Sequence, residues 1–374
     1  MIVRPPFLPW FPLLLFTGLL LLSYAFNLNG WWGTERLEYL RVSKSILDHW
    51  QGGESGVLVA GEYNRIYAFL GATLQYFSVA PNVALQVISW LSYSVSGLLM
   101  ERLLSMLAQG SRSESRLSFV ILVWVLAPVV VGTGLSVGGA ALEMVTILAA
   151  FFYGLRWVEQ ERASDTIWMV LFTTLSAMMR PALVGLVLPL VLVSGWGLVA
   201  RRKWRWLVAA VLSEAVLVTM VGCLHEQFMA PINASVLFQQ WSPIHFFQRS
   251  FSTGNGVVGY LLPNVLFLFS LIIHPWYFLL LPGLLLLVKR TDFILPAKKT
   301  VLLCLSTYFM VLGGLPQQQV VALLPAYAMV LWLLFPAWDR LYCYGLYFVR
   351  KPTGLLLGFM LLMQLFFNIW VLFV

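Results

Sequence analysis

Charged residues are scarce in this chain: aspartate, glutamate, lysine and arginine together make up 10% of its 374 residues. A soluble protein carries about 25% charged residues. This scarcity, together with a hydrophobic content of 60%, excludes a water-soluble globular domain. A helical membrane span needs about 20 apolar residues, so the chain can hold on the order of ten spans with their loops. The composition therefore predicts an all-α integral membrane protein.

Several site signatures are also missing. The three cysteines show no paired or metal-ligand spacing, and the four histidines match no metal signature. No glycine-rich nucleotide loop, internal repeat or low-complexity segment is present. We therefore expect no cofactor and no metal site, and the sequence offers no support for a divalent metal. The net charge of +8 indicates basic cytoplasmic loops rather than a nucleic-acid partner.

Hydropathy predicts about 11 transmembrane helices (10–12) in a single domain covering residues 1–374. The predicted spans lie near residues 7–26, 82–107, 117–135, 140–158, 167–179, 182–199, 206–223, 265–288, 300–314, 318–336 and 354–374. An N-terminus inside the cell places most of the 23 lysines and arginines in cytoplasmic loops, as the positive-inside rule requires. This orientation predicts two longer extracytoplasmic segments, at residues 27–81 and 224–264.

One predicted span is too short for a straight crossing. Thr166 to Met179 is about 21 Å of helix, against a hydrocarbon core of about 30 Å. Basic residues flank the two predicted spans near 167–179 and 182–199, at Arg162 and Arg201. The chain therefore crosses to the outer face in the first of these spans and returns in the second. Proline breaks helices, which places the turn at Arg180-Pro181. Arg180 is expected to point toward a cavity or the outer interface, because an arginine is costly in lipid.

The first extracytoplasmic segment concentrates carboxylates: five of the fifteen lie between residues 35 and 62. Thr34 can cap a helix running to Trp50. One side of this helix is apolar, and we interpret it as an interfacial helix on the outer face after the first span. The polar side predicts two pairs, Lys44–Asp48 and Glu38–Arg41. Glu35 lies near the apolar side beside Glu38, an environment that suits a general base; a purely anchoring helix is the alternative.

Five short segments resemble motifs of the polytopic glycosyltransferases of the GT-C superfamily. They are closest to the mannosyltransferases that build GPI anchors and N-glycan precursors, and to their bacterial relatives. The segments are "GTERLEY" with Glu35, "GEYNRIYAF" with Glu62 and Arg65, "SVGGAALEM" with Glu143, "SAMMRP" with Arg180, and "HPWYFLLLPG" with His274, Trp276 and Tyr277. A sixth motif departs from the family: "LPQQQVVALLP" has Gln317, Gln318 and Gln319 where relatives carry charged residues.

The resemblance implies transfer of a sugar, plausibly mannose, from a polyprenyl-phosphate donor to a lipid-linked or glycan acceptor on the extracytoplasmic face, with inversion. It implies that Glu35 is the catalytic base, with Glu38 and Glu62 as alternatives. Arg65 and Arg180 would hold the donor phosphate, and the remaining substrate-binding candidates are Glu143, His274, Trp276 and Tyr277. The membrane would be a bacterial plasma membrane, or the endoplasmic reticulum in a eukaryote, and membrane lipids would be the other partners.

Several alternatives stay open at this point. Glu143 and Arg180 can instead form a structural pair, and Trp276 and Tyr277 can be interfacial anchors. Glu214, inside the span near 206–223, is either functional or packed against a polar neighbour. For the whole chain, the alternatives are a flippase or transporter of lipid-linked sugars, and a catalytically inactive subunit of a glycan-assembly complex. The glutamines at 317–319 favour the second of these.

Overall fold

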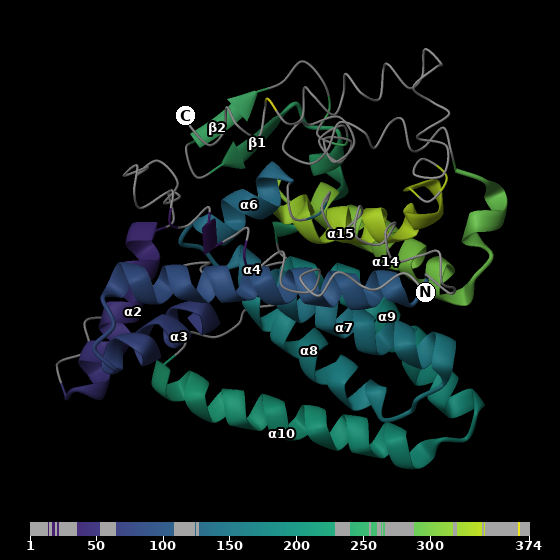
Figure 1. The fold of residues 1–374 in the computed structure, drawn as a ribbon, viewed down its shortest axis with the longest axis horizontal. Helices are drawn as coiled ribbons and strands as arrows, with labels where there is room; N and C mark the ends of the chain where they lie inside the picture. Colours follow the sequence, from purple (N-terminus) through teal and green to yellow (C-terminus); the bar gives the residue numbers. More distant parts are fainter. Residues whose placement is uncertain are drawn as a thin grey trace. The chain divides into compact units, whose positions relative to one another are not determined.

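The structure is a computed structural model, and it describes residues 36–52, 65–107, 127–228, 240–253, 256–259, 288–316 and 320–338, with a few single positions besides. The chain forms two compact units. One contains residues 29–96 and 132–240, and the other contains residues 1–28, 97–131 and 241–374. Figure 1 labels the helices and the two strands.

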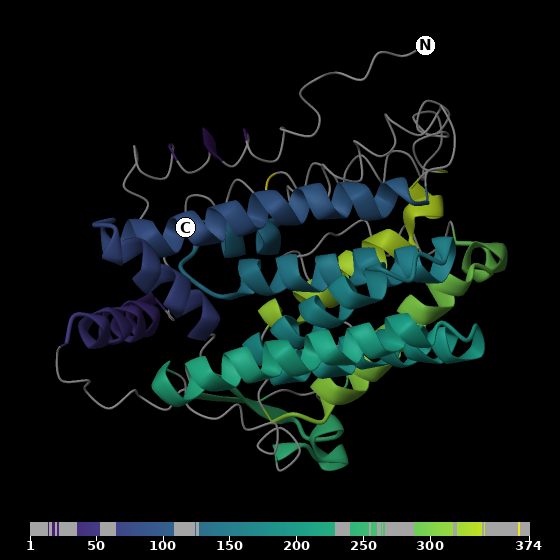
Figure 2. The ribbon, with the colours of Figure 1, turned by 90° about the horizontal axis from the view of Figure 1, so that it is seen from below.

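Four helices of the first unit pack on one another: α7 (Ala140–Gln160), α8 (Asp165–Met179), α9 (Val184–Ala200) and α10 (Trp204–Phe228). They lie side by side in both views (Figures 1 and 2). Within the described residues, α4 (Pro81–Ser105), α7 and the segment Pro181–Ala200 are long and apolar enough to cross a membrane, and α8 is a shorter apolar helix. These helices are apolar on most sides because lipid and neighbouring helices replace water around them.

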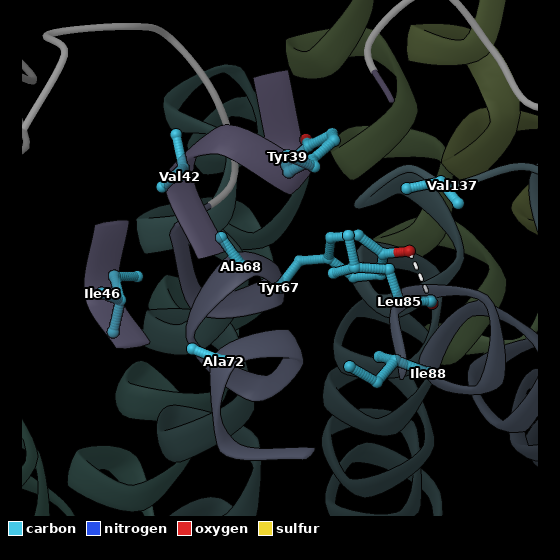
Figure 3. Close-up of a cluster of buried hydrophobic side chains, with 9 residues drawn as sticks. All are labelled: Tyr39, Val42, Ile46, Tyr67, Ala68, Ala72, Leu85, Ile88 and Val137. Carbon is cyan, nitrogen blue, oxygen red and sulfur yellow. Dashed lines mark hydrogen bonds between the residues drawn. The ribbon is translucent and has the colours of Figure 1, made fainter. Parts of the chain in front are cut away.

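The remaining helices of this unit form a small core at the start of α4. Helices α2 (Arg36–Trp50) and α3 (Arg65–Tyr76) pack together, and their apolar side chains meet those of α4 (Figure 3). Tyr67 is fully buried, its hydroxyl donates a hydrogen bond of 2.7 Å to the carbonyl oxygen of Leu85, and its ring meets that of Tyr39 edge to face at 5.0 Å. Gly71 allows the close approach, since a Cβ there would overlap the side chain of Leu85.

The second unit contains α14 (Pro296–Gly313), α15 (Leu324–Leu333) and a β-hairpin. Buried polar groups link its elements: the hydroxyl of Tyr308 donates to the carbonyl oxygen of Ala322, and the indole N–H of Trp332 donates to that of Leu103 at 2.9 Å. This unit also contains the 3₁₀ segments η4 (Pro243–Phe246), η6 (Arg290–Phe293) and η7 (Val320–Leu323). Helix α6 (Pro128–Leu135), like α4, runs in sequence from one unit into the other.

The described helices follow most of the predicted spans. α4, α7, α8, α9, α10, α14 and α15 cover the spans predicted near 82–107, 140–158, 167–179, 182–199, 206–223, 300–314 and 318–336. The predicted spans near 7–26, 265–288 and 354–374 lie almost wholly outside the described residues, and of the span near 117–135 only Trp124 and residues 127–135 are described, with α6 in its second half. The total of about 11 therefore stays a prediction.

Two details of the loop expected at 224–264 differ from the prediction. Helix α10 continues to Phe228. The strands β1 (Ser250–Thr253) and β2 (Gly256–Gly259) form an antiparallel hairpin in which Ser250 lies opposite Gly259. The hairpin was missed because its strands, SFST and GVVG, are four residues long and carry no sustained hydrophobic alternation, the usual sign of a strand. The other regular elements in the described residues are helical, as expected from the composition.

Candidate functional site

An ion pair between Glu143 and Arg180 lies where α7 begins and α8 ends. The Nε atom of Arg180 is 3.2 Å from Oε2 of Glu143. The Glu143 side chain is buried, with 6% of its surface exposed, while the Arg180 side chain keeps 25% exposed. A buried carboxylate therefore holds a guanidinium that still reaches solvent. Of the predicted site residues, these are the two that the described structure brings together.

Local sequence explains both positions. Pro181 disfavours the helical conformation in the residue before it, and Arg180 is accordingly extended, with φ −148° and ψ 111°. Helix α8 therefore ends at Met179, and a 3₁₀ turn (η3, Pro181–Leu183) leads into α9. This confirms the break predicted at Arg180-Pro181. Glu143 lies in the first turn of α7, where the helix dipole stabilises a negative charge.

Buried hydroxyl groups hold the two helices together beside the pair. The hydroxyl of Ser176 on α8 donates to that of Thr146 on α7 at 2.9 Å, and Thr146 donates to the carbonyl oxygen of Glu143 at 2.9 Å. Both hydroxyls are buried. In an apolar environment such contacts fix the relative position of helices. The backbone that carries Glu143 is thus tied to α8 independently of its carboxylate.

Glu38 is the other predicted catalytic residue whose side chain the structure describes. It lies in the first turn of α2 and is half-buried. As predicted, Tyr39, Val42 and Ile46 share the buried side of this helix. However, that side contacts α3 and α4 instead of the lipid that an interfacial helix would face.

The two ion pairs predicted on α2 are not formed. The structure describes all four side chains, and no ion pair joins Lys44 to Asp48 or Glu38 to Arg41. Arg41, Lys44 and Asp48 are exposed, and exposed pairs have little to gain from contact, since water screens them.

The rest of the predicted site cannot be placed. Glu35, Glu62, His274, Trp276 and Tyr277 lie outside the described residues, as do Gln317, Gln318 and Gln319. Arg65 is the first residue of α3, but its side chain is also outside the described set. Among the described residues, no three His, Cys, Asp or Glu side chains are grouped so that they could hold a metal ion.

Sequence reasoning missed the structural role of Tyr67, two residues after Arg65. Burial raises the pKa of the Tyr67 hydroxyl, against smaller opposing effects of hydrogen bonds with Ser89 and with the backbone at Gly138. The hydroxyl therefore stays neutral and anchors α3 to α4. The continuous apolar run in "RIYAFL" was the available signal, but a tyrosine in such a run is also typical of an interfacial residue.

Glu214 has a polar neighbour on another helix. Its Oε1 atom lies within hydrogen-bond distance of the Thr174 hydroxyl on α8. Its other oxygen, Oε2, is buried without a hydrogen-bond partner in the described structure. The Thr174 hydroxyl also lies 3.1 Å from the carbonyl oxygen of Val170. This supports the packing interpretation of Glu214, with α10 tied to α8 through one polar contact.

Comparison with known proteins shows the fold. No family model matches the sequence, and no curated protein matches it either. Among solved structures, the chain is similar to ArnT from Cupriavidus metallidurans, whose crystal structure contains undecaprenyl phosphate. The TM-score is 0.54 and the identity is 17%, over 87% of this chain. The chain corresponds to 60% of the length of ArnT. The likeness shows that this chain and ArnT share a fold.

Proposed function

We propose that this protein transfers a sugar from a polyprenyl-phosphate donor to a lipid-linked or glycan acceptor at the extracytoplasmic face of the membrane. The observation that carries the proposal is the similarity of most of the chain to a glycosyltransferase crystallised with undecaprenyl phosphate. The sequence motifs favour mannose as the sugar. A bacterial plasma membrane is the proposed location, because the structural neighbour is bacterial.

The proposed reaction is a single displacement. A carboxylate removes the proton of the acceptor hydroxyl, the hydroxyl oxygen forms the new bond to the anomeric carbon, and polyprenyl phosphate leaves with the electrons of the broken bond. Attack opposite the leaving group inverts the configuration. Glu35 is the proposed base because it matches the acidic position of the family motif, and Glu38 and Glu62 are the alternatives.

Arg180 is the proposed phosphate-binding residue that the structure describes. A guanidinium has five N–H donors in a rigid plane, and the contact with Glu143 is made through Nε. The Arg180 side chain is 25% exposed, so a phosphate can approach its exposed part while the pair with Glu143 stays in place. In this arrangement Glu143 is a positioning residue. Arg65, His274, Trp276 and Tyr277 complete the proposed donor site by their motif matches.

A transfer assay in proteoliposomes tests the proposal. Purified protein is given a polyprenyl-phosphate sugar labelled in the sugar, with a lipid extract as the acceptor source, and labelled product is separated from the donor. We expect labelled product that depends on the protein, with mannose preferred over glucose and galactose. If product forms with another sugar but not with mannose, the proposed transfer reaction stands and mannose is wrong as its sugar.

The same vesicles separate the two alternatives. Movement of the labelled donor between leaflets without product would identify a flippase. Neither movement nor product, from protein that binds the donor, would favour an inactive subunit and reject the proposed transfer. Arg180→Ala is the matched variant, and it is expected to lose donor binding in each of these assays.

A further inference from the structure

The turn between α9 and α10 places an arginine where glycine is favoured. The backbone N–H groups of Arg202 and Lys203 donate to the carbonyl oxygens of Val199 and Leu198, at 3.0 and 2.9 Å. This is the helix-ending motif whose left-handed residue is usually glycine. Here that residue is Arg202, with φ 54°. A side chain in this conformation is strained, yet Arg202 extends it into solvent.

The two cations beside Arg202, Arg201 and Lys203, contact other residues of the protein. Arg201 pairs with Glu161 at 3.1 Å, and Lys203 donates to the carbonyl oxygen of Glu161 at 3.1 Å. Both lie over the ring of Trp157, at 5.2 and 4.9 Å from its centroid. These contacts hold the 201–203 turn against the end of α7. Arg201 and Lys203 therefore stabilise the fold, which leaves the charge of Arg202 to be explained.

Arg202 belongs to a group of three exposed arginines at this end of the α7–α10 bundle. Arg162 lies in the α7–α8 connection, and Arg205 lies in the first turn of α10. The Arg201–Glu161 pair brings the two connections together. In the described part of the chain, Arg162, Arg202 and Arg205 form no ion pair, whereas nearby Asp165 is already bound by Arg156 at 2.8 Å. The other carboxylates at this end are Glu161, which pairs with Arg201, and the exposed Glu159, so basic side chains outnumber carboxylates on this surface.

Exposed tryptophans surround the same end. They are Trp168 near the start of α8, Trp196 near the end of α9, and Trp204 and Trp206 at the start of α10, with exposed fractions of 51%, 74%, 52% and 38%. Exposed tryptophans at the ends of apolar helices mark the headgroup level of a bilayer. Along the chain, Arg162 and Arg202 lie just beyond Trp168 and Trp196, and Arg205 lies between Trp204 and Trp206. The arginines therefore adjoin residues typical of the headgroup level, where lipid phosphates are found.

We propose that Arg162, Arg202 and Arg205 form a binding site for the phosphate groups of anionic phospholipids, with the tryptophans at the level of the lipid glycerol. Guanidinium groups bind phosphate oxygens in pairs of hydrogen bonds, and the exposed indole rings fit the boundary between headgroup and acyl chain. The partner is an anionic lipid leaflet and not a free anion, because the cations adjoin apolar helix ends. The proposal is independent of the transferase function.

Lipid retention by the full-length protein tests this site. The protein is placed in nanodiscs with equal amounts of phosphatidylglycerol and phosphatidylcholine, extracted into detergent, and the retained lipids are counted by native mass spectrometry. We expect the wild type to retain phosphatidylglycerol in preference. Arg202→Gly combined with Arg205→Gln should reduce that preference by at least about fivefold. Lys44→Gln, which removes an exposed cation from α2, is the control and should have no effect.

The glycine variant separates binding from folding. Because glycine suits a left-handed position, Arg202→Gly should unfold at the same or a higher temperature than the wild type while retaining less phosphatidylglycerol. Equal retention by the double variant, an equal loss with Lys44→Gln, or no lipid preference in the wild type would overturn the proposal. Displacement of the lipid by low concentrations of inorganic phosphate would also overturn it, since the site would then bind free anions.

Discussion

The Nε atom of Arg180 lies 3.2 Å from Oε2 of Glu143, and this pair joins the end of α8 to the first turn of α7. Removing one partner leaves the other charge without its counter-ion in a largely buried place. Because Arg180 is a quarter exposed, we expect Glu143→Ala to destabilise the protein by roughly 1–3 kcal/mol. Arg180→Ala should have a similar effect on stability and should also abolish transfer.

A double-mutant cycle checks this prediction. Thermal unfolding of the two single variants and of the double variant in detergent should give a coupling energy of about 1 kcal/mol or more, since the residues are in contact. If activity per folded molecule is retained in Arg180→Ala, the pair is structural only and the phosphate role is wrong. If the two effects are additive, the ion pair contributes nothing.

The distribution of basic residues predicts the orientation in the membrane, with the 201–205 turn inside and the 224–264 segment outside. A cysteine introduced at Asn255 should react with a membrane-impermeant maleimide added to intact cells. One introduced at Lys203 should react only after the cells are opened. Labelling of the Lys203 position from outside would invert the topology and move the candidate site to the cytoplasmic face.

Glu214 offers a test of packing against function. Its Oε2 atom is buried without a partner in the described structure, and an unpaired buried oxygen is unfavourable. Thr174 keeps the Val170 carbonyl as a partner when Glu214 is removed. We therefore expect Glu214→Leu to leave the unfolding temperature unchanged or to raise it, with activity retained. Activity lost from a protein of unchanged stability would instead assign Glu214 to the reaction.

Asp292 links stability to pH in the second unit. Burial opposes its charge, but the hydrogen bonds from Arg340 and from the backbone N–H of Lys289 outweigh it, so the pKa of the Asp292 carboxyl is lowered. A lowered pKa in the folded state contributes stability above the unfolded value of about 4. That contribution is lost as the pH falls through the folded value. Asp292→Asn should thus destabilise the protein at pH 7.

The pH dependence is measured by thermal unfolding of Asp292→Asn and wild type in detergent. The difference between them should be constant from about pH 8 to pH 5 and should shrink below about pH 4, where the wild-type carboxyl is protonated. Asp48→Asn, at an exposed position on α2, is the control. A difference that persists at the lowest pH would mean that the Asp292–Arg340 pair does not stabilise the fold.

The sequence predicts helix positions well where one physical signal dominates. Hydropathy alone places α7, α8 and α9 to within a few residues, and Pro181 sets the turn at Arg180 because the residue before a proline avoids the helical conformation. The buried side of α2 was also predicted correctly, from helical periodicity.

Periodicity cannot tell what covers an apolar face. Tyr39 and Ile46 suit lipid and protein equally, and only the tertiary structure shows that α3 and α4 cover them. Similarly, the spacing of Lys44 and Asp48 permits an ion pair, but such a pair adds little stability when both side chains are exposed to water. The Glu143–Arg180 contact joins residues that are far apart in sequence. The motif matches identified both residues as candidates but could not predict whether they are in contact.

Transfer by the Glu35→Gln variant tests the central claim most directly, because Glu35 is the proposed base. Glutamine keeps the size of the side chain and removes its ability to accept the proton. The initial rate of sugar transfer from labelled polyprenyl-phosphate sugar should fall by at least about a hundredfold. Asp48→Asn, at an exposed position on α2, should change the rate by less than about threefold. Full activity in both Glu35→Gln and Glu62→Gln would contradict the account.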